Sequence, residues 1–209
     1  MKHLKKKGIL PLAVILLLLA AALGSLALSG AEENTETLTG TWYAQIDIKD
    51  YGTIQAELYA DIAPVTVTNF VNLVNSGFYD GLTFHRIISG FMIQGGDPNG
   101  NGTGGSSKKI RGEFSSNGFA NDLLHTRGVL SMARSSDPDS ASSQFFIMHQ
   151  DAPHLDGAYA AFGKVISGME VVDAICENTP VEDRNGTVAK ENQPVITSIR
   201  MIEDPAKAE

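Results

Sequence analysis

Arg86 lies in a segment that would otherwise read as an apolar strand. Leu82–Ile88 is mostly apolar and is followed by Ser89-Gly90 and a second apolar run, Phe91–Gln94, which is typical of two short strands joined by a turn. An unpaired guanidinium is costly to bury, so we expect Arg86 to point into a cleft. The alternative is a half-exposed strand that carries its charge on the solvent face, as alternating strands often do.

Other residues that could do chemistry are scattered. His85, His125, His149 and His154 fall on different predicted elements, and no Cys/His cluster has the spacing of metal ligands. No nucleophile-elbow pattern of a serine hydrolase is present. The single cysteine, Cys176, lies in an apolar helical pattern and is expected to be a buried structural thiol. The sequence therefore predicts no metal site.

A glycine-rich segment follows the two short strands. Residues 95–118 are rich in Gly, Ser and Asn, and Gly100–Gly105 superficially resembles a dinucleotide-binding fingerprint. A fingerprint of that kind needs a strand before it and an apolar helix after it, and neither is predicted here. We therefore expect a long loop and no bound cofactor.

The remaining pattern predicts short strands and two helices. One helix begins at Pro64, with Asp61 near its positive end, and ends at Gly77; the second covers residues 169–176. Many short strands at irregular spacing suggest a closed antiparallel barrel. The expected strands are 42–48, 53–59, 82–88, 91–94, 128–133, 144–148, 162–165 and 195–202.

Five motifs in order carry a family resemblance. They are FHRIISGFMIQGGD at 84–97, GVLSMAR at 128–134, SQFFI at 143–147, HLDG at 154–157 and FGKV at 162–165. Together they resemble the cyclophilin family of peptidyl-prolyl cis–trans isomerases, bacterial-like members included, over residues 43–202. The resemblance implies a mainly β fold, a closed eight-stranded antiparallel barrel capped by two α-helices.

The reaction of that family needs no nucleophile, metal or cofactor. Amide resonance gives the peptide bond a rotation barrier of about 20 kcal/mol, and a cation that donates toward the prolyl nitrogen favours the twisted state. The resemblance implies that Arg86 is this donor and that Gln94 orients it. It implies a proline pocket formed by Phe91, Met92, Phe146 and Leu155, and a groove for the preceding residues formed by Ala133, Arg134 and Gln144.

Three residues of the expected substrate site depart from the family pattern. His154 stands where many eukaryotic members have a tryptophan, Tyr159 where they have a histidine, and Arg134 where they have an asparagine. Because Arg86 and its support are intact, we expect isomerisation to survive. The inhibitor cyclosporin relies on that tryptophan in such members, so we do not expect it to bind here in the same way. Arg134 is expected to shift which residue before proline is preferred.

The N-terminus is of a different kind. Four lysines precede the apolar run Ile9–Leu28, and small residues follow it. Residues 1–31 are predicted to be a cleaved signal peptide or a retained signal anchor that engages the membrane or the export machinery, 32–40 a polar tether, and 41–204 the isomerase domain. Either N-terminal alternative places the domain outside the cytoplasm.

The acidic balance limits the partners. The chain has a formal net charge of −8, and its acidic residues all follow the N-terminal lysines, which argues against nucleic acid. The expected partners are proline-containing peptides and unfolded proteins, and we expect a monomer. The alternative function is a non-catalytic chaperone or adaptor that binds proline peptides on the same fold; the presence of Arg86 with Gln94 and Phe146 favours the enzyme.

Overall fold

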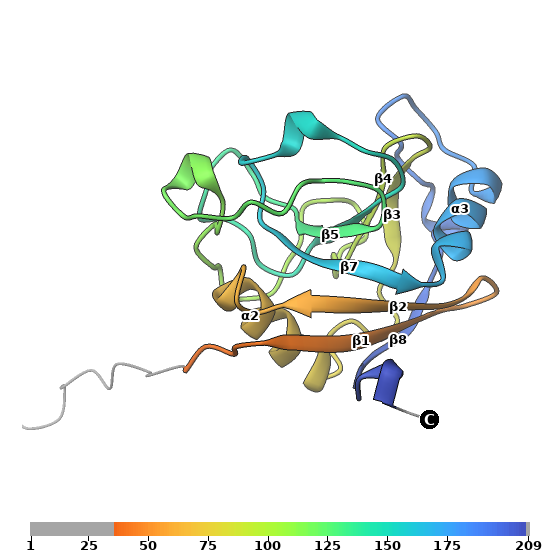
Figure 1. Cartoon of the computed structure of the whole chain (residues 1–209). Helices are drawn as coiled ribbons and strands as arrows, with labels where there is room; N and C mark the ends of the chain where they lie inside the picture. The colour runs from red at the N-terminus through yellow and green to blue at the C-terminus, as the bar shows by residue number, and fades with distance from the viewer. Residues whose placement is uncertain (1–35, 208–209) are drawn as a thin grey trace, which may run out of the picture. The chain divides into compact units, whose positions relative to one another are not determined.

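The computed structural model describes residues 36–207, which contain one eight-stranded sheet (Figure 1). The strand order is β3-β4-β6-β5-β7-β2-β1-β8, and all neighbouring strands are antiparallel. The mainly β prediction is confirmed. The strands are β1 (Thr41–Ile48), β2 (Gly52–Tyr59), β3 (Phe84–Ile88), β4 (Met92–Gly95), β5 (Val129–Met132), β6 (Phe145–Met148), β7 (Ala161–Ser167) and β8 (Ile196–Ile202).

The sheet is an open half-barrel, so the predicted closed barrel is wrong in its closure. The end strands β3 and β8 share no ladder. A few backbone hydrogen bonds between residues 81–84 and 194–196, around the isolated bridge of Thr83 and Val195, join their ends. The outer edge of β3 pairs instead with residues 186–188, where the N–H of Ile87 donates to the carbonyl of Gly186 at 2.8 Å. Since these groups are already bonded, β8 cannot continue the ladder along β3.

Helix α2 (Pro64–Asn75) begins against a buried carboxylate. Its first position is a proline, which needs no hydrogen-bond acceptor, and the carboxylate of Glu113 accepts the N–H groups of Val65 and Thr66 at 2.9 and 2.8 Å. A negative charge at this end also complements the helix dipole. The sequence suggested Asp61 for this role, but the carboxylate of Asp61 bonds to a backbone N–H of another segment.

The last residue of α2 is Asn75, and Gly77, the predicted end of the helix, lies two residues further on. Its φ of +70° suits glycine, and its N–H bonds to the carbonyl of Val74. The second helix is α3 (Met169–Asn178), at the right of Figure 1. Cys176 on α3 is buried, and burial raises the pKa of its thiol to about 12. Four short 3₁₀ helices complete the fold: η1 (Ser115–Asn117), η2 (Pro153–Leu155), η3 (Lys190–Asn192) and η4 (Pro205–Lys207).

Aromatic side chains join α2 to the inner face of the sheet. The ring of Phe70 on α2 lies 5.2, 5.5 and 5.3 Å from the rings of Tyr79, Phe145 and Phe162. All four side chains are fully buried. Such contacts add to the burial of large apolar area, so α2 fixes the inner face of β6 and β7.

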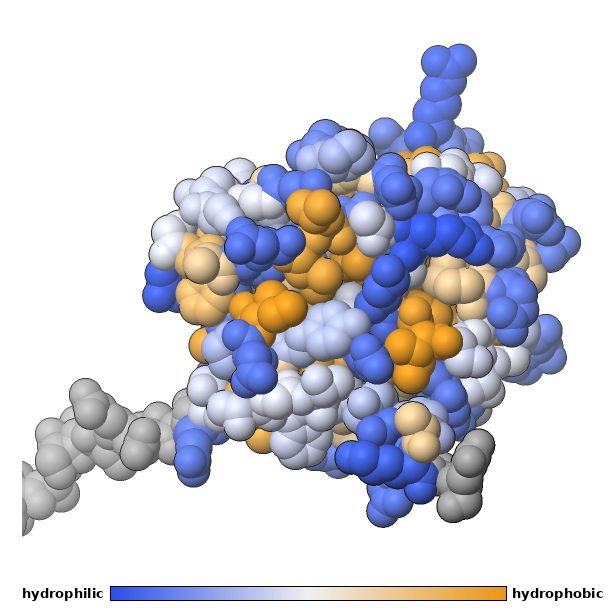
Figure 2. All heavy atoms as spheres, viewed as in Figure 1, coloured by the Kyte–Doolittle hydropathy of each residue, from blue (hydrophilic) through white to orange (hydrophobic). Residues whose placement is uncertain are grey.

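The predicted signal or anchor segment, 1–31, lies outside the described residues. Within residues 36–207, no helix is both long and apolar enough to cross a membrane. Figure 2 shows apolar residues on one face gathered in separate patches among hydrophilic ones.

Candidate active site

The outer face of β4 and β6 carries a second apolar cluster, separate from the main core. Because side chains alternate along a strand, Met92 and Phe146 lie on this outer face, whereas Ile93 and Phe145 belong to the main core. The outer cluster is completed by Val129, Met148, Ala152, Leu155 and Ala161, with Phe91, Ala133 and Tyr159 packed against it.

A pocket of about 240 Å³ opens above this cluster. Its floor is apolar, since Met92, Phe146 and Leu155 are at most 8% exposed, and a guanidinium lies at its edge. An apolar pocket with a few polar groups is the usual form of a small ligand site. All of its lining residues were predicted from the sequence: Arg86, Phe91, Met92, Gln94, Ala133, Arg134, Phe146, Leu155 and Tyr159.

Arg86 is held at the edge of the pocket by two hydrogen bonds to oxygen and a longer one, of 3.8 Å, to the sulfur of Met92. Its Nε donates to the backbone carbonyl of Asn185 at 2.8 Å, and one terminal nitrogen donates to Oε1 of Gln94 at 3.2 Å. Burial lowers the pKa of Arg86, while Tyr159 and Asp183 act in the opposite direction. A guanidinium stays protonated at physiological pH, so the pocket carries a fixed, partly desolvated cation.

The carbonyl that holds Arg86 comes from a turn that approaches β3 closely. Gly186 has a φ of +78°, and a Cβ there would lie 2.2 Å from the carbonyl oxygen of Ile87. Only glycine allows this approach, which sets the Asn185 carbonyl beside the guanidinium. Asn185 was not predicted as a site residue, because its contact with Arg86 uses the backbone carbonyl and leaves no side-chain signal in the sequence.

Two glutamines, here called the glutamine relay, link Arg86 to the loop after β4. Gln94 Nε2 donates to Gln144 Oε1 at 2.9 Å, and Gln144 Nε2 donates to the carbonyls of Gly102 and Gly104 at 3.1 and 2.7 Å. These carbonyls can only accept, so they fix which end of each amide faces which partner. The relay therefore presents the oxygen of Gln94 to Arg86.

The loop that supplies those carbonyls is organised by the buried carboxylate of Asp97. It accepts the N–H groups of Asn99, Asn101 and Gly102 at 2.8, 3.1 and 2.6 Å. Burial acts to raise the pKa of Asp97, but backbone N–H donors outweigh it and lower that pKa. Asp97 therefore stays ionised and keeps the loop in place for the relay.

Arg134 lies between two aromatic rings. Its guanidinium carbon is 4.6 Å from the ring centroid of Tyr159 and 5.1 Å from that of Phe114, and its Nε and a terminal nitrogen donate to the carbonyl of Ala158 at 3.1 and 2.9 Å. Stacking and hydrogen bonds together fix the charge at the pocket wall. Tyr159 is in turn edge-on to Phe146, at 5.9 Å.

The last two predicted residues lie beside the pocket. Gln144 lines a neighbouring pocket of about 250 Å³ that shares Gln94, Ala133 and Arg134 with the first. His154 is exposed and lies over Phe91, with ring centroids 5.5 Å apart. The structure thus brings all predicted site residues to one region, and their individual roles stay predictions.

Two findings identify the class of protein that this fold and site define. A sequence model of the family described as "Cyclophilin type peptidyl-prolyl cis-trans isomerase/CLD" matches residues 43–201, well over half of the chain. The chain is 50% identical over 123 residues to Peptidyl-prolyl cis-trans isomerase B of Bacillus subtilis, covering 59% of this chain and 82% of that protein. The chain belongs to the cyclophilin-type peptidyl-prolyl cis–trans isomerase family, and the expectation of an enzyme is confirmed.

A solved structure has the same fold. A cyclophilin type peptidyl-prolyl cis–trans isomerase of Cryptosporidium parvum, crystallised in the presence of the dipeptide Ala-Pro, superposes with a TM-score of 0.68 at 35% identity. The match covers 78% of this chain and 99% of that one. A longer relative, Peptidyl-prolyl cis-trans isomerase-like 2 of Rhizopus delemar, is 43% identical over 164 residues, which are 78% of this chain and only 29% of that protein. Bacterial and eukaryotic relatives both match, so the expectation of a bacterial-like member stays a prediction.

Proposed function

We propose that Arg86 catalyses rotation about the X–Pro bond of a peptide whose proline ring occupies the 240 Å³ pocket. The observation that carries this proposal is a cation held at the edge of an apolar pocket by Asn185 and Gln94. In the twisted state the prolyl nitrogen becomes pyramidal and gains a lone pair that can accept a hydrogen bond. A donor fixed in advance stabilises that state more than the planar one.

The other pocket residues would bind and orient the peptide. Met92, Phe146 and Leu155 offer an apolar surface for the pyrrolidine ring, and Phe91 closes one side of it. Ala133, Arg134 and Gln144 line the adjoining pocket, where residues before the proline would lie. The relatives' names and the Ala-Pro dipeptide of the Cryptosporidium structure support proline-containing peptides as partners.

The test is the rate of cis–trans exchange of a short X–Pro peptide with and without the full-length protein. Uncatalysed exchange takes about 10–100 s at 25 °C, so acceleration is easily measured. We expect acceleration by the wild type and loss of most of it in Arg86→Ala. Arg200→Ala, which removes an exposed arginine paired with Asp80, serves as the control and should keep the wild-type rate. A folded wild type without acceleration would contradict the proposal.

We also propose that the protein works outside the cytoplasm, as a monomer, on proteins that fold there. The support for this location is the sequence of residues 1–31, with its lysines and the apolar run Ile9–Leu28. A protein with a C-terminal tag should be digested by protease added to intact spheroplasts. Mass analysis of its N-terminus then distinguishes a cleaved signal from a retained anchor, and protection from the protease would contradict this location.

A further inference from the structure

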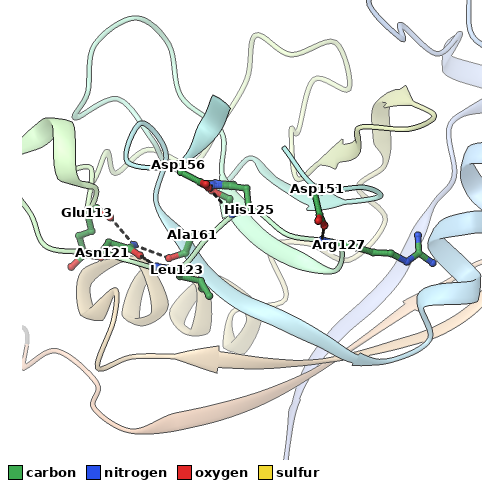
Figure 3. Close-up of polar contacts among 9 residues, drawn as sticks. Glu113, Asn121, Leu123, His125, Arg127, Asp151, Asp156 and Ala161 are labelled. Carbon is green, nitrogen blue, oxygen red and sulfur yellow. Dashed lines mark hydrogen bonds and ion pairs between the residues drawn. The ribbon is translucent and has the colours of Figure 1, made fainter. Parts of the chain in front are cut away.

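A buried histidine lies behind the proline pocket and is bonded through every polar group that it has. His125 Nδ1 is 3.0 Å from Oδ1 of Asp156, and Nε2 is 3.0 Å from the hydroxyl of Ser131. The backbone N–H of His125 donates to the same oxygen of Asp156 at 2.7 Å (Figure 3), and its carbonyl accepts the N–H of Ala152 at 2.8 Å. The side chain of His125 is 1% exposed.

The series Ser131, His125 and Asp156 has the order of a hydrolytic triad, but its burial excludes that chemistry. Ser131 is fully buried and lines neither pocket of the candidate active site, so no substrate carbonyl can reach its hydroxyl. Burial lowers the pKa of His125, although Asp156 acts in the opposite direction. The ring is therefore neutral, with Nδ1–H donating to the carboxylate and Nε2 accepting from the hydroxyl.

His125 contacts one wall of the pocket directly and holds the turn that carries another. Its ring stacks on Phe146, with centroids 6.1 Å apart and an interplanar angle of 19°. Asp156 directly follows Leu155, and Ala152 directly precedes η2, so the bonds of His125 hold both ends of the turn that carries Leu155. Phe146 and Leu155 are two of the apolar groups that would receive the proline ring.

We propose that His125 and Asp156 are positioning residues for the isomerase reaction, setting the ring of Phe146 and the turn of Leu155 at the spacing that the proline requires. This inference rests on the proposed function of the pocket. A catalytic wall displaced by about 1 Å can cost up to about 100-fold in rate, so the cost of losing the pair should appear in catalysis as well as in stability.

The same stretch of chain offers a matched control, because hydrogen bonds hold it at Asn121 and Arg127 as well as at His125 (Figure 3). Asn121 donates to the carbonyls of Glu113 and Ala161, each at 2.9 Å, and the N–H of Arg127 donates to Asp151 at 2.8 Å. Neither Asn121 nor Asp151 lines the pocket. Asn121 bonds to no residue of the turn that carries Leu155, so its removal loosens the stretch and leaves the bonds of His125 to Asp156 and Ala152 in place.

The experiment compares four variants of the full-length protein with the wild type. His125→Phe keeps an aromatic ring and removes both side-chain hydrogen bonds. Asp156→Asn keeps an oxygen that can accept from His125, whereas Asp156→Ala removes it. Asn121→Ala is the control, because it removes buried hydrogen bonds that hold the same stretch of chain. For each we would measure kcat and KM on an X–Pro peptide, the melting temperature, and the aromatic NMR signals of Phe146.

We expect kcat/KM to fall by about tenfold in His125→Phe and Asp156→Ala, with Phe146 signals shifted, and to stay near the wild-type value in Asp156→Asn. Asn121→Ala should lower the melting temperature and leave kcat/KM unchanged. Should His125→Phe not fold, the contrast between Asp156→Ala and Asp156→Asn decides. Unchanged kcat/KM in Asp156→Ala, or an equal loss of kcat/KM in Asn121→Ala, would overturn the positioning role and leave the proposed function standing. An inactive wild type would overturn the proposed function itself.

Discussion

The side chains of Gln94 and Gln144 share a hydrogen bond of 2.9 Å, and this bond links the loop after β4 to Arg86. Gln144 uses its nitrogen on the carbonyls of Gly102 and Gly104, so its oxygen is the group left for Gln94. The orientation of the arginine thus depends on a residue that it does not contact.

Replacing Gln144 by alanine should therefore impair catalysis at a distance. Without its partner, the amide of Gln94 can rotate and turn its nitrogen toward the guanidinium of Arg86. A guanidinium has only donors, so the hydrogen bond between the two side chains would be lost. We expect kcat/KM to fall by about tenfold, roughly the cost of one hydrogen bond to a charged group. Gln55→Ala, on the surface of β2, is the control, and steady-state peptide kinetics is the measurement. Equal rates for Gln144→Ala and the wild type would show that the relay does not orient Arg86.

Glu113 should matter for stability and not for the reaction. Its buried carboxylate accepts the first free N–H groups of α2, and Glu113→Gln replaces one accepting oxygen by a donor. We expect a loss of about 1–3 kcal/mol in the free energy of unfolding, measured with urea, with kcat/KM unchanged for the folded fraction. Asp61→Asn should cost much less. The reverse ranking of the two variants would contradict the assignment of Glu113 as the anchor of α2.

Arg134 should favour acidic residues before the proline. Its charge is fixed at the wall shared by two pockets, and neither pocket is lined by a carboxylate. A carboxylate about 4 Å away in water gains about 1 kcal/mol, so a peptide with Glu before proline should be turned over about fivefold better than one with the neutral Gln. The preference should shrink in high salt and in Arg134→Asn. A ratio that is the same in wild type and Arg134→Asn would assign the selectivity elsewhere.

Stability should fall as the pH drops below about 6.5, the ordinary pKa of histidine. Burial lowers the pKa of both His85 and His125, although Asp97 and Asp156, respectively, oppose the shift. The unfolded histidines therefore bind protons at a higher pH than the folded ones, so acid favours the unfolded state below the ordinary value of about 6.5. Urea unfolding at several pH values should show this slope, and the slope should be reduced in His125→Phe. A slope that His125→Phe leaves intact would contradict the shift at His125.

Much of this fold could be predicted because its signals are local. A few consecutive residues are enough to show the alternation along Thr41–Ile48 and Gly52–Tyr59. The same is true of the proline that begins α2 and the glycine that follows the helix. The pocket residues could be predicted for another reason. Their motifs match a family, and the fold brings β3, β4 and β6 together as that family implies.

The errors and omissions arise from contacts between distant segments. The predicted closure of the barrel was wrong because residues 186–188 occupy the edge of β3. A polar loop carries no sequence pattern that indicates which strand it will pair with. Glu113 lies 48 residues from Val65, whereas Asp61 was the nearer acid in sequence. No role for His125 could be predicted, because only the folded chain brings its hydrogen-bond partners Ser131 and Asp156 next to it.

The role of Arg86 is tested most directly by measuring peptide binding and X–Pro bond rotation separately. Wild type and Arg86→Ala would each be mixed with an X–Pro peptide, and NMR would give both the dissociation constant and the cis–trans exchange rate of the bound peptide. We expect an exchange rate at least about 100-fold lower in Arg86→Ala, because a preorganised donor of this kind contributes about 3–4 kcal/mol. The dissociation constants of the two proteins should agree within about fivefold. Equal bound-state exchange rates in the two proteins would contradict the role of Arg86.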